Sequence, residues 1–128
     1  MNNQTKQASI RAGRGLVLAA RWSWQGLKAA WSCESSFRTE VLCTVILIPI
    51  AVYFGHSGLE RATLIASLLL VLAMELANSA IETVIERFGP EQHYLAGRAK
   101  DMGSAAVFVL LLNVIVCWTC ILLPHFVH

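Results

Sequence analysis

The chain has 128 residues, of which 56% are hydrophobic and only 14% are charged, and its formal net charge is +2. A soluble domain is usually about half apolar and about a quarter charged, so this composition argues against a soluble fold and favours contact with lipid. The length allows one domain, over residues 1–128. The small net charge argues neither for nor against nucleic acid, and we expect no nucleic acid partner.

The first expected element is an amphipathic helix over residues 8–32. Its apolar residues recur at helical spacing and share one face, namely Leu16, Ala20, Trp24, Leu27 and Trp31. A different face carries a basic residue at every seventh position, namely Arg14, Arg21 and Lys28. Basic residues opposite tryptophan and leucine are typical of a helix that lies in the membrane interface, so we expect this helix to lie on the bilayer.

Three hydrophobic segments follow, and we expect each to cross the membrane as a helix, over residues 36–54, 62–85 and 101–123. The apolar part of the first segment, Val41 to Phe54, would cover only about 21 Å of a hydrocarbon core of about 30 Å. Its helix must therefore begin earlier and take in Arg38 and Glu40 near the headgroups. The expected fold is an all-α membrane protein with one interfacial helix and three transmembrane helices.

The distribution of lysine and arginine predicts the orientation of these segments. The N-terminal region and the connection between the second and third segments are basic, whereas the turn between the first two segments holds only Arg61 and the C-terminal tail has no lysine or arginine. Basic loops stay in the cytoplasm. We therefore expect a multi-pass membrane protein with a cytoplasmic N-terminus and a periplasmic C-terminus.

A polar stripe runs along the second membrane segment. Its members are spaced by three or four residues, so they share one face of a helix: Glu75, Asn78, Ser79, Glu82 and Glu86. A carboxylate that faces lipid near the centre of the membrane costs roughly 2.5–3.5 kcal/mol on insertion scales, so the stripe must face protein or water. Helix packing could account for Asn78 and Ser79, but carboxylates suggest a divalent cation, a proton carrier or a general base.

Further charged residues converge on the same membrane face. Glu34 lies at the start of the first membrane segment, and Lys100 and Asp101 open the third. This combination suits an anionic, metal-bound substrate such as a nucleoside triphosphate, although the chain has no phosphate-binding glycine loop of the G-x-x-x-x-G-K-[ST] type. The residues alone leave two alternatives open, a metal-dependent membrane enzyme and a small proton- or cation-coupled transporter.

Two long motifs then carry a resemblance to a known family. They are Glu75-Leu-Ala-Asn-Ser-Ala-Ile-Glu82 and Gly97-Arg-Ala-Lys-Asp-Met-Gly-Ser-Ala105, preceded by Trp24-Gln-Gly-Leu-Lys-Ala-Ala-Trp31 and Glu34-Ser-Ser-Phe-Arg-Thr-Glu40. In order and spacing they resemble the bacterial membrane diacylglycerol kinase family over nearly the whole chain from Trp22. The resemblance implies a homotrimer in the bacterial inner membrane with its sites at subunit interfaces. It also implies an enzyme of phospholipid recycling that transfers the γ-phosphate of ATP to diacylglycerol, giving phosphatidic acid, with Mg²⁺ required.

The resemblance also implies roles for individual residues. Glu75 matches the family's general base, with Asn78 beside it in the catalytic stripe, and Glu34 and Glu82 match its metal ligands. The positions that match the ATP-binding region are Arg14, Trp22, Glu34, Glu82, Glu91, Gln92, His93, Lys100 and Asp101. The positions that match the lipid substrate or its support are Ala20, Trp24, Lys28, Arg38, Glu40, Glu75 and Ser104. At one position the chain departs from the family, because the usual ATP-contacting arginine aligns with Gly15, one residue from Arg14.

Two other functions stay open at this point. An undecaprenol kinase of the same superfamily would use the same phosphoryl chemistry on another lipid alcohol, and apolar walls discriminate lipid tails weakly. A small proton-coupled transporter would use Glu75 and Glu82 as proton carriers and would need no ATP.

Overall fold

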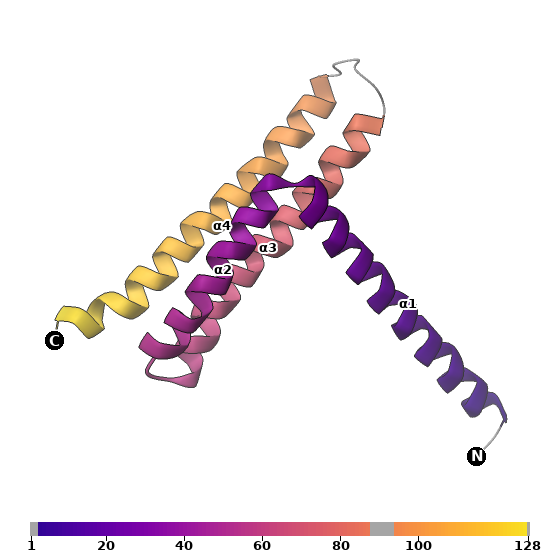
Figure 1. Ribbon diagram of the computed structural model, residues 1–128, viewed down its shortest axis with the longest axis horizontal. Helices are drawn as coiled ribbons and strands as arrows, with labels where there is room; N and C mark the ends of the chain where they lie inside the picture. The colour runs from indigo at the N-terminus through magenta and orange to yellow at the C-terminus, as the bar shows by residue number, and fades with distance from the viewer. Residues whose placement is uncertain (1–2, 88–93, 128) are drawn as a thin grey trace. The chain divides into compact units, whose positions relative to one another are not determined.

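The structure is a computed structural model that describes the backbone of residues 3–87 and 94–127, with side chains for 15–87, 94–125 and 127. The regular structure of these residues is entirely α-helical, in the order α1 (Asn3–Cys33), α2 (Ser35–Phe54), α3 (Gly58–Arg87) and α4 (Tyr94–Val127) (Figure 1). The prediction of an all-α chain is therefore confirmed. The chain divides into two compact units, Met1–Cys33 and Glu34–His128.

The first unit consists of α1, a single helix of 31 residues. Large apolar side chains on it remain exposed, with Leu16 at 74% and Trp24 at 61% of their full accessible area. The ammonium group of Lys28 lies over the Trp24 ring, 5.8 Å from the ring centre. Exposed tryptophan and leucine side chains beside basic residues are common in helices that lie in a membrane interface.

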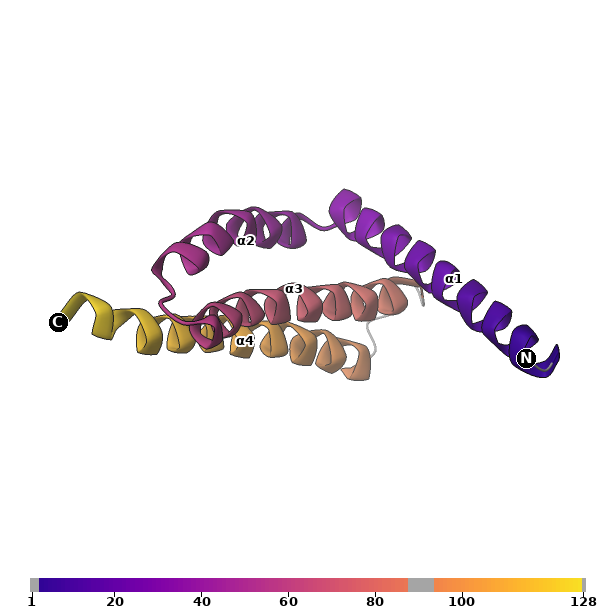
Figure 2. The ribbon, with the colours of Figure 1, turned by 90° about the horizontal axis from the view of Figure 1, so that it is seen from below.

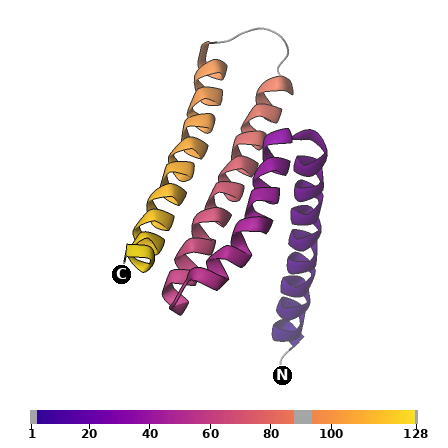
Figure 3. The same ribbon diagram turned by 60° about the vertical axis from the view of Figure 1, so that its left-hand side comes forward.

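The second unit contains three helices, with α3 between α2 and α4 (Figures 2 and 3). The side chains of Leu64, Leu68 and Val71 are buried on one face of α3, because a spacing of three or four residues brings them into line. Phe37 from α2 and Val107 from α4 are also buried.

All three helices of this unit are long and apolar enough to cross a membrane, over Ser35–Phe54, Gly58–Arg87 and Tyr94–His125. The predicted number of helices that are long and apolar enough to cross a membrane is therefore confirmed. Residues outside the expected segments, such as Arg87 and Lys100, continue the helical conformation. The hydrophobic pattern marks the part of a helix that fits a bilayer, whereas charged residues can extend the helix beyond it.

A tight connection between α2 and α3 makes the two helices antiparallel. The backbone N–H of Gly55 donates to the carbonyl of Ala51 at 3.0 Å, and the Arg61 side chain donates from Nε to the carbonyl of Gly55 at 2.8 Å. A Cβ atom at Gly55 would come within 2.7 Å of Arg61 Cγ and 2.8 Å of the Ala51 oxygen, so the turn requires glycine here. As a result, the beginning of α2 lies beside the second half of α3.

Candidate functional site

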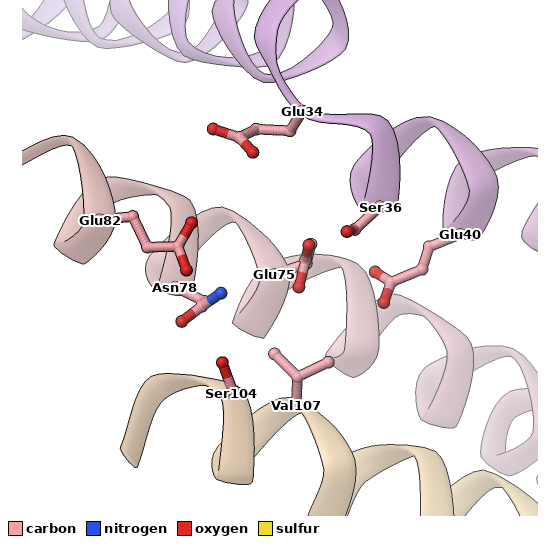
Figure 4. Close-up of a pocket in the computed structure, with 8 residues that line it drawn as sticks. All are labelled: Glu34, Ser36, Glu40, Glu75, Asn78, Glu82, Ser104 and Val107. Atoms are coloured by element: carbon pink, nitrogen blue, oxygen red, sulfur yellow. The ribbon is translucent and has the colours of Figure 1, made fainter. Parts of the chain in front are cut away.

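A cavity of about 260 Å³ opens where the start of α2 meets the second half of α3 and the first part of α4 (Figure 4). It is lined by Glu34, Ser36, Glu40, Glu75, Asn78, Glu82, Ser104 and Val107. We call this cavity the acidic pocket. It brings together six residues that the sequence analysis singled out, from three helices and from the junction before α2.

The α3 side of the acidic pocket is formed by Glu75, Asn78 and Glu82. Their spacing of three and four residues places them on one face of the helix, and Glu75 and Asn78 are only 6% and 8% exposed. The side chain of Glu82 retains 22% of its accessible area. The carboxylate of Glu75 is thus enclosed by protein, whereas that of Glu82 lies nearer the open end.

The α2 side contributes the partners of Glu75. The Ser36 hydroxyl donates a hydrogen bond to the Glu75 carboxylate, and in Figure 4 the side chains of Ser36 and Glu40 lie around that carboxylate. This hydrogen bond links the start of α2 to Glu75 on α3. Another oxygen of the α2 side, Oε2 of Glu40, is buried and has no hydrogen-bond partner among the described residues.

The α4 side approaches α3 closely at Asn78. A Cβ atom at the buried Gly103 would overlap Oδ1 of Asn78, so the absence of a side chain at Gly103 allows the two helices to meet there. The next residue, Ser104, consequently lies in the wall of the acidic pocket.

The acidic pocket holds four carboxyl groups, those of Glu34, Glu40, Glu75 and Glu82, and no basic residue is among its described lining residues. The ammonium group of Lys100 lies beside the acidic pocket, with Nζ 3.5 Å from Glu82 Oε1 and with a side chain that is 55% exposed. A pair this exposed contributes little electrostatic stabilisation. The Lys100 ammonium therefore offsets little of the negative charge on Glu82.

The donor atoms of the acidic pocket fit a magnesium ion. Mg²⁺ prefers oxygen ligands, usually one or two carboxylates together with water and substrate phosphates. The polar groups that line the acidic pocket are carboxylates, two hydroxyls and the Asn78 amide. Oε2 of Glu40 is buried without a hydrogen-bond partner in the described part of the chain. Such an oxygen costs roughly 1–3 kcal/mol unless something binds it.

Several residues named from the sequence do not line the acidic pocket. Arg38 on α2 is half-buried outside it, and Asp101 on α4 is exposed. Four others belong to α1, in the first unit: Ala20, Trp22, Trp24 and Lys28. The side chain of Arg14 lies outside the described side chains, and three residues lie outside the described residues altogether: Glu91, Gln92 and His93.

Two lining residues were missed by the sequence analysis, Ser36 and Val107. Ser36 lies one helical turn before Glu40, and Val107 lies three residues after Ser104, so each shares a helix face with a residue that was named. That spacing was the available signal, although a serine and a valine in such segments suggest no particular chemistry.

Comparison with known proteins gives a consistent picture. Residues 21–122 match the profile of the family described as "Prokaryotic diacylglycerol kinase". A diacylglycerol kinase of Escherichia coli strain K12 is 43% identical over 111 residues, which cover 87% of this chain and 91% of the relative. Those of Haemophilus influenzae and Pseudomonas aeruginosa are 48% and 49% identical, covering 80% and 84% of this chain and 87% and 88% of the relatives. The profile match includes every residue that lines the acidic pocket.

Proposed function

The chain belongs to the prokaryotic diacylglycerol kinase family, and we propose that it transfers the γ-phosphate of ATP to diacylglycerol at the acidic pocket, giving phosphatidic acid. It is a diacylglycerol kinase and a bacterial multi-pass membrane protein. The observation that carries the proposed site is the convergence of four carboxyl groups in one cavity of a membrane helix bundle. Phosphoryl transfer needs mainly positioning and charge neutralisation, so a small helical site suffices.

Glu75 is the proposed general base. Its carboxylate accepts the proton of the diacylglycerol hydroxyl while the hydroxyl oxygen bonds to the γ-phosphorus, and the bond from that phosphorus to the bridging oxygen of ADP breaks. Glu75 is only 6% exposed, so protein shields its carboxylate from bulk water. This burial supports the role of general base, because the lipid hydroxyl reaches the carboxylate from the membrane. The hydrogen bond from Ser36 holds one orientation of the carboxylate, and Asn78 lies one turn further along α3.

Glu34 and Glu82 are the proposed ligands of Mg²⁺. When bound there, the ion neutralises negative charge on the β- and γ-phosphates of ATP. The lack of a basic residue among the described lining residues supports a cation at this position. Lys100, beside Glu82, is exposed enough to turn toward a phosphate group.

The remaining assignments rest on the family resemblance. The proposed nucleotide contacts, besides Glu34 and Glu82, are Arg14, Trp22, Glu91, Gln92, His93, Lys100 and Asp101. The proposed contacts to the lipid or its supports, besides Glu75, are Ala20, Trp24, Lys28, Arg38, Glu40 and Ser104. The exposed tryptophans and basic residues of α1 support its position in the membrane interface, where the diglyceride headgroup also lies.

A homotrimer in the inner membrane, with a cytoplasmic N-terminus and a periplasmic C-terminus, completes the proposal. A chain of 128 residues has little surface with which to enclose both ATP and a lipid, so a neighbouring subunit is expected to complete each site. Only 6% of the 18-residue apolar stretch of α4 is buried within one chain. Most of that stretch is therefore left to contact lipid or a second subunit. The oligomeric state is tested by native mass spectrometry of the protein in micelles, where the proposal requires a mass three times that of the chain.

The experiment that tests the function supplies purified protein in mixed micelles with ATP labelled at the γ-phosphate. Diacylglycerol and undecaprenol are offered separately, each with and without Mg²⁺. We expect label in phosphatidic acid, dependent on Mg²⁺. Label in undecaprenyl phosphate instead would assign the other lipid alcohol, and label in neither product would contradict the proposed reaction.

A further inference from the structure

A second cluster of ligand-type side chains lies at the other end of the three-helix unit, outside the acidic pocket. His56 is in the connection between α2 and α3, Glu60 is in the first turn of α3, and His125 is in the last turn of α4. Figure 3 shows this connection and the end of α4 at the same end of the unit. Glu60 and Glu75 lie fifteen residues apart on α3, so roughly 22 Å of helix separates this cluster from the acidic pocket.

The three side chains are close to one another. Nε2 of His125 is 3.3 Å from Oε2 of Glu60, and the centres of the His56 and His125 rings are 3.9 Å apart. Each residue offers one ligand atom, and these three atoms all lie within 4.8 Å of one another.

We propose that His56, Glu60 and His125 form a binding site for a divalent transition-metal cation of the zinc class. Two imidazoles and one carboxylate are a ligand set that Zn²⁺ uses in proteins when its fourth position holds water. Imidazole ligands select zinc, copper and nickel over magnesium and calcium, which prefer oxygen. This cluster therefore differs in chemistry from the all-oxygen acidic pocket.

The distances suit such a cation after small side-chain movements. Ligand atoms at about 2.0–2.1 Å from a tetrahedral zinc ion are roughly 3.3 Å from one another, and the pair formed by His125 and Glu60 already has this separation. The remaining ligand atom, from His56, lies within 4.8 Å of the other two, so it needs to approach them by roughly 1.5 Å at most to reach that separation. The side chains of His125 and Glu60 are 25% and 28% exposed, so they can rotate and a cation can enter from water.

The carboxylate of Glu60 is held in place by the backbone around it. The N–H of His56 donates to Oε2 of Glu60 at 2.8 Å, and the N–H of Glu60 donates to the hydroxyl of Ser57 at 3.1 Å. These bonds orient the carboxylate, as outer-shell hydrogen bonds do at metal sites. A carboxylate has about four lone-pair positions, so the bond from His56 leaves others for a cation.

A cation bound here would link the end of α4 to the connection between α2 and α3. In the proposed topology this end of the unit faces the periplasm, away from MgATP. The role of the site is then structural or regulatory, and its occupancy can be measured without assaying the kinase.

The test uses the full chain, purified in micelles without a polyhistidine tag, stripped of metal and kept in millimolar Mg²⁺ to occupy oxygen sites. Zn²⁺ is titrated in competition with a chromophoric chelator, and Co²⁺ is used as a spectroscopic probe. We expect one Zn²⁺ per chain, and we expect His56→Ala, His125→Ala and Glu60→Gln each to weaken its binding at least tenfold. Glu86→Gln is the matched control for Glu60→Gln, because Glu86 is an exposed glutamate near the other end of α3, and it should leave the affinity unchanged.

Two results would overturn the proposal. One is the absence of Zn²⁺ binding to the wild-type chain. The other is equal affinity in the wild type and in the double variant His56→Ala/His125→Ala, which circular dichroism must show to be folded. Binding through the cysteines would give this second result, and it would also add a strong thiolate charge-transfer band to the Co²⁺ spectrum.

Discussion

Asn78 on α3 and Gly103 on α4 face each other so closely that a Cβ atom at Gly103 would overlap the amide oxygen of Asn78. Asn78 lines the acidic pocket, and its Oδ1 has no hydrogen-bond partner in the described part of the chain. The orientation of Asn78 in the acidic pocket therefore depends on how closely α3 and α4 approach each other at Gly103.

Gly103→Ala should therefore displace the Asn78 amide. We expect lower turnover, because the added methyl group forces Asn78 into another rotamer, and a loss of roughly 1–3 kcal/mol of stability from overpacking. Phosphatidic acid formation and thermal unfolding in micelles measure the two effects. In an Asn78→Ala background the stability cost of Gly103→Ala should largely disappear, because the two residues interact directly.

Gly97→Ala is the matched control on the same helix. No atom lies within 4 Å of a Cβ built there, and glycine is a poor helix former. The variant should be as stable as the wild type or more so. If Gly103→Ala were as stable as Gly97→Ala, α3 and α4 would not be in tight contact at Gly103.

Gly55→Ala should destabilise the connection between α2 and α3. Its Cβ would lie 2.8 Å from the backbone oxygen of Ala51 and 2.7 Å from Arg61 Cγ, and the backbone has little freedom to move. We expect a lower thermal midpoint, with a cost of about 1–3 kcal/mol. Gly58→Ala is the control, because nothing lies within 4 Å of a Cβ at that position, and an unchanged midpoint for Gly55→Ala would refute the steric argument.

Glu82→Gln and Glu34→Gln should raise the concentration of Mg²⁺ needed for half-maximal activity. Each change removes a negative charge from the proposed metal ligands while it keeps the size of the side chain. Turnover is measured as a function of Mg²⁺ at fixed ATP, with Glu86→Gln as the control, since Glu86 is exposed on the same helix outside the acidic pocket. An unchanged Mg²⁺ dependence in both variants would remove the two residues from the metal site.

The sequence predicted the membrane helices well because a bilayer imposes a length of about twenty apolar residues on each crossing. It also predicted that Glu75, Asn78 and Glu82 share a face, since that follows from helical spacing alone. The sequence could not show which α2 residues meet this face, because their register depends on the turn at Gly55.

The sequence also could not predict contacts between residues that are far apart along the chain. The approach of Gly103 to Asn78 depends on how α3 and α4 pack. Glu60 and His125 are 65 residues apart, and only the folded chain brings them to 3.3 Å. Local periodicity carries no information about either pair.

Ser36→Ala should lower turnover modestly, by roughly threefold to tenfold. It removes the hydrogen bond that the Ser36 hydroxyl donates to Glu75, and the net contribution of a typical hydrogen bond is about 0.5–1.5 kcal/mol. Ser36→Thr keeps the hydroxyl and should retain more activity. If both variants match the wild type in phosphatidic acid formation, the hydrogen bond does not position the base.

The central claim, that Glu75 accepts the proton of the lipid hydroxyl, is tested most directly by phosphatidic acid formation in Glu75→Gln. The substitution keeps the shape of the side chain and its capacity to accept a hydrogen bond from Ser36, but an amide cannot take up the proton. We expect the variant to fold and to bind MgATP like the wild type, with turnover lower by roughly 10²–10⁴-fold, the usual contribution of general base catalysis. Glu86→Gln, measured in parallel, should stay near wild-type turnover. A folded Glu75→Gln enzyme with the activity of the wild type would contradict the account.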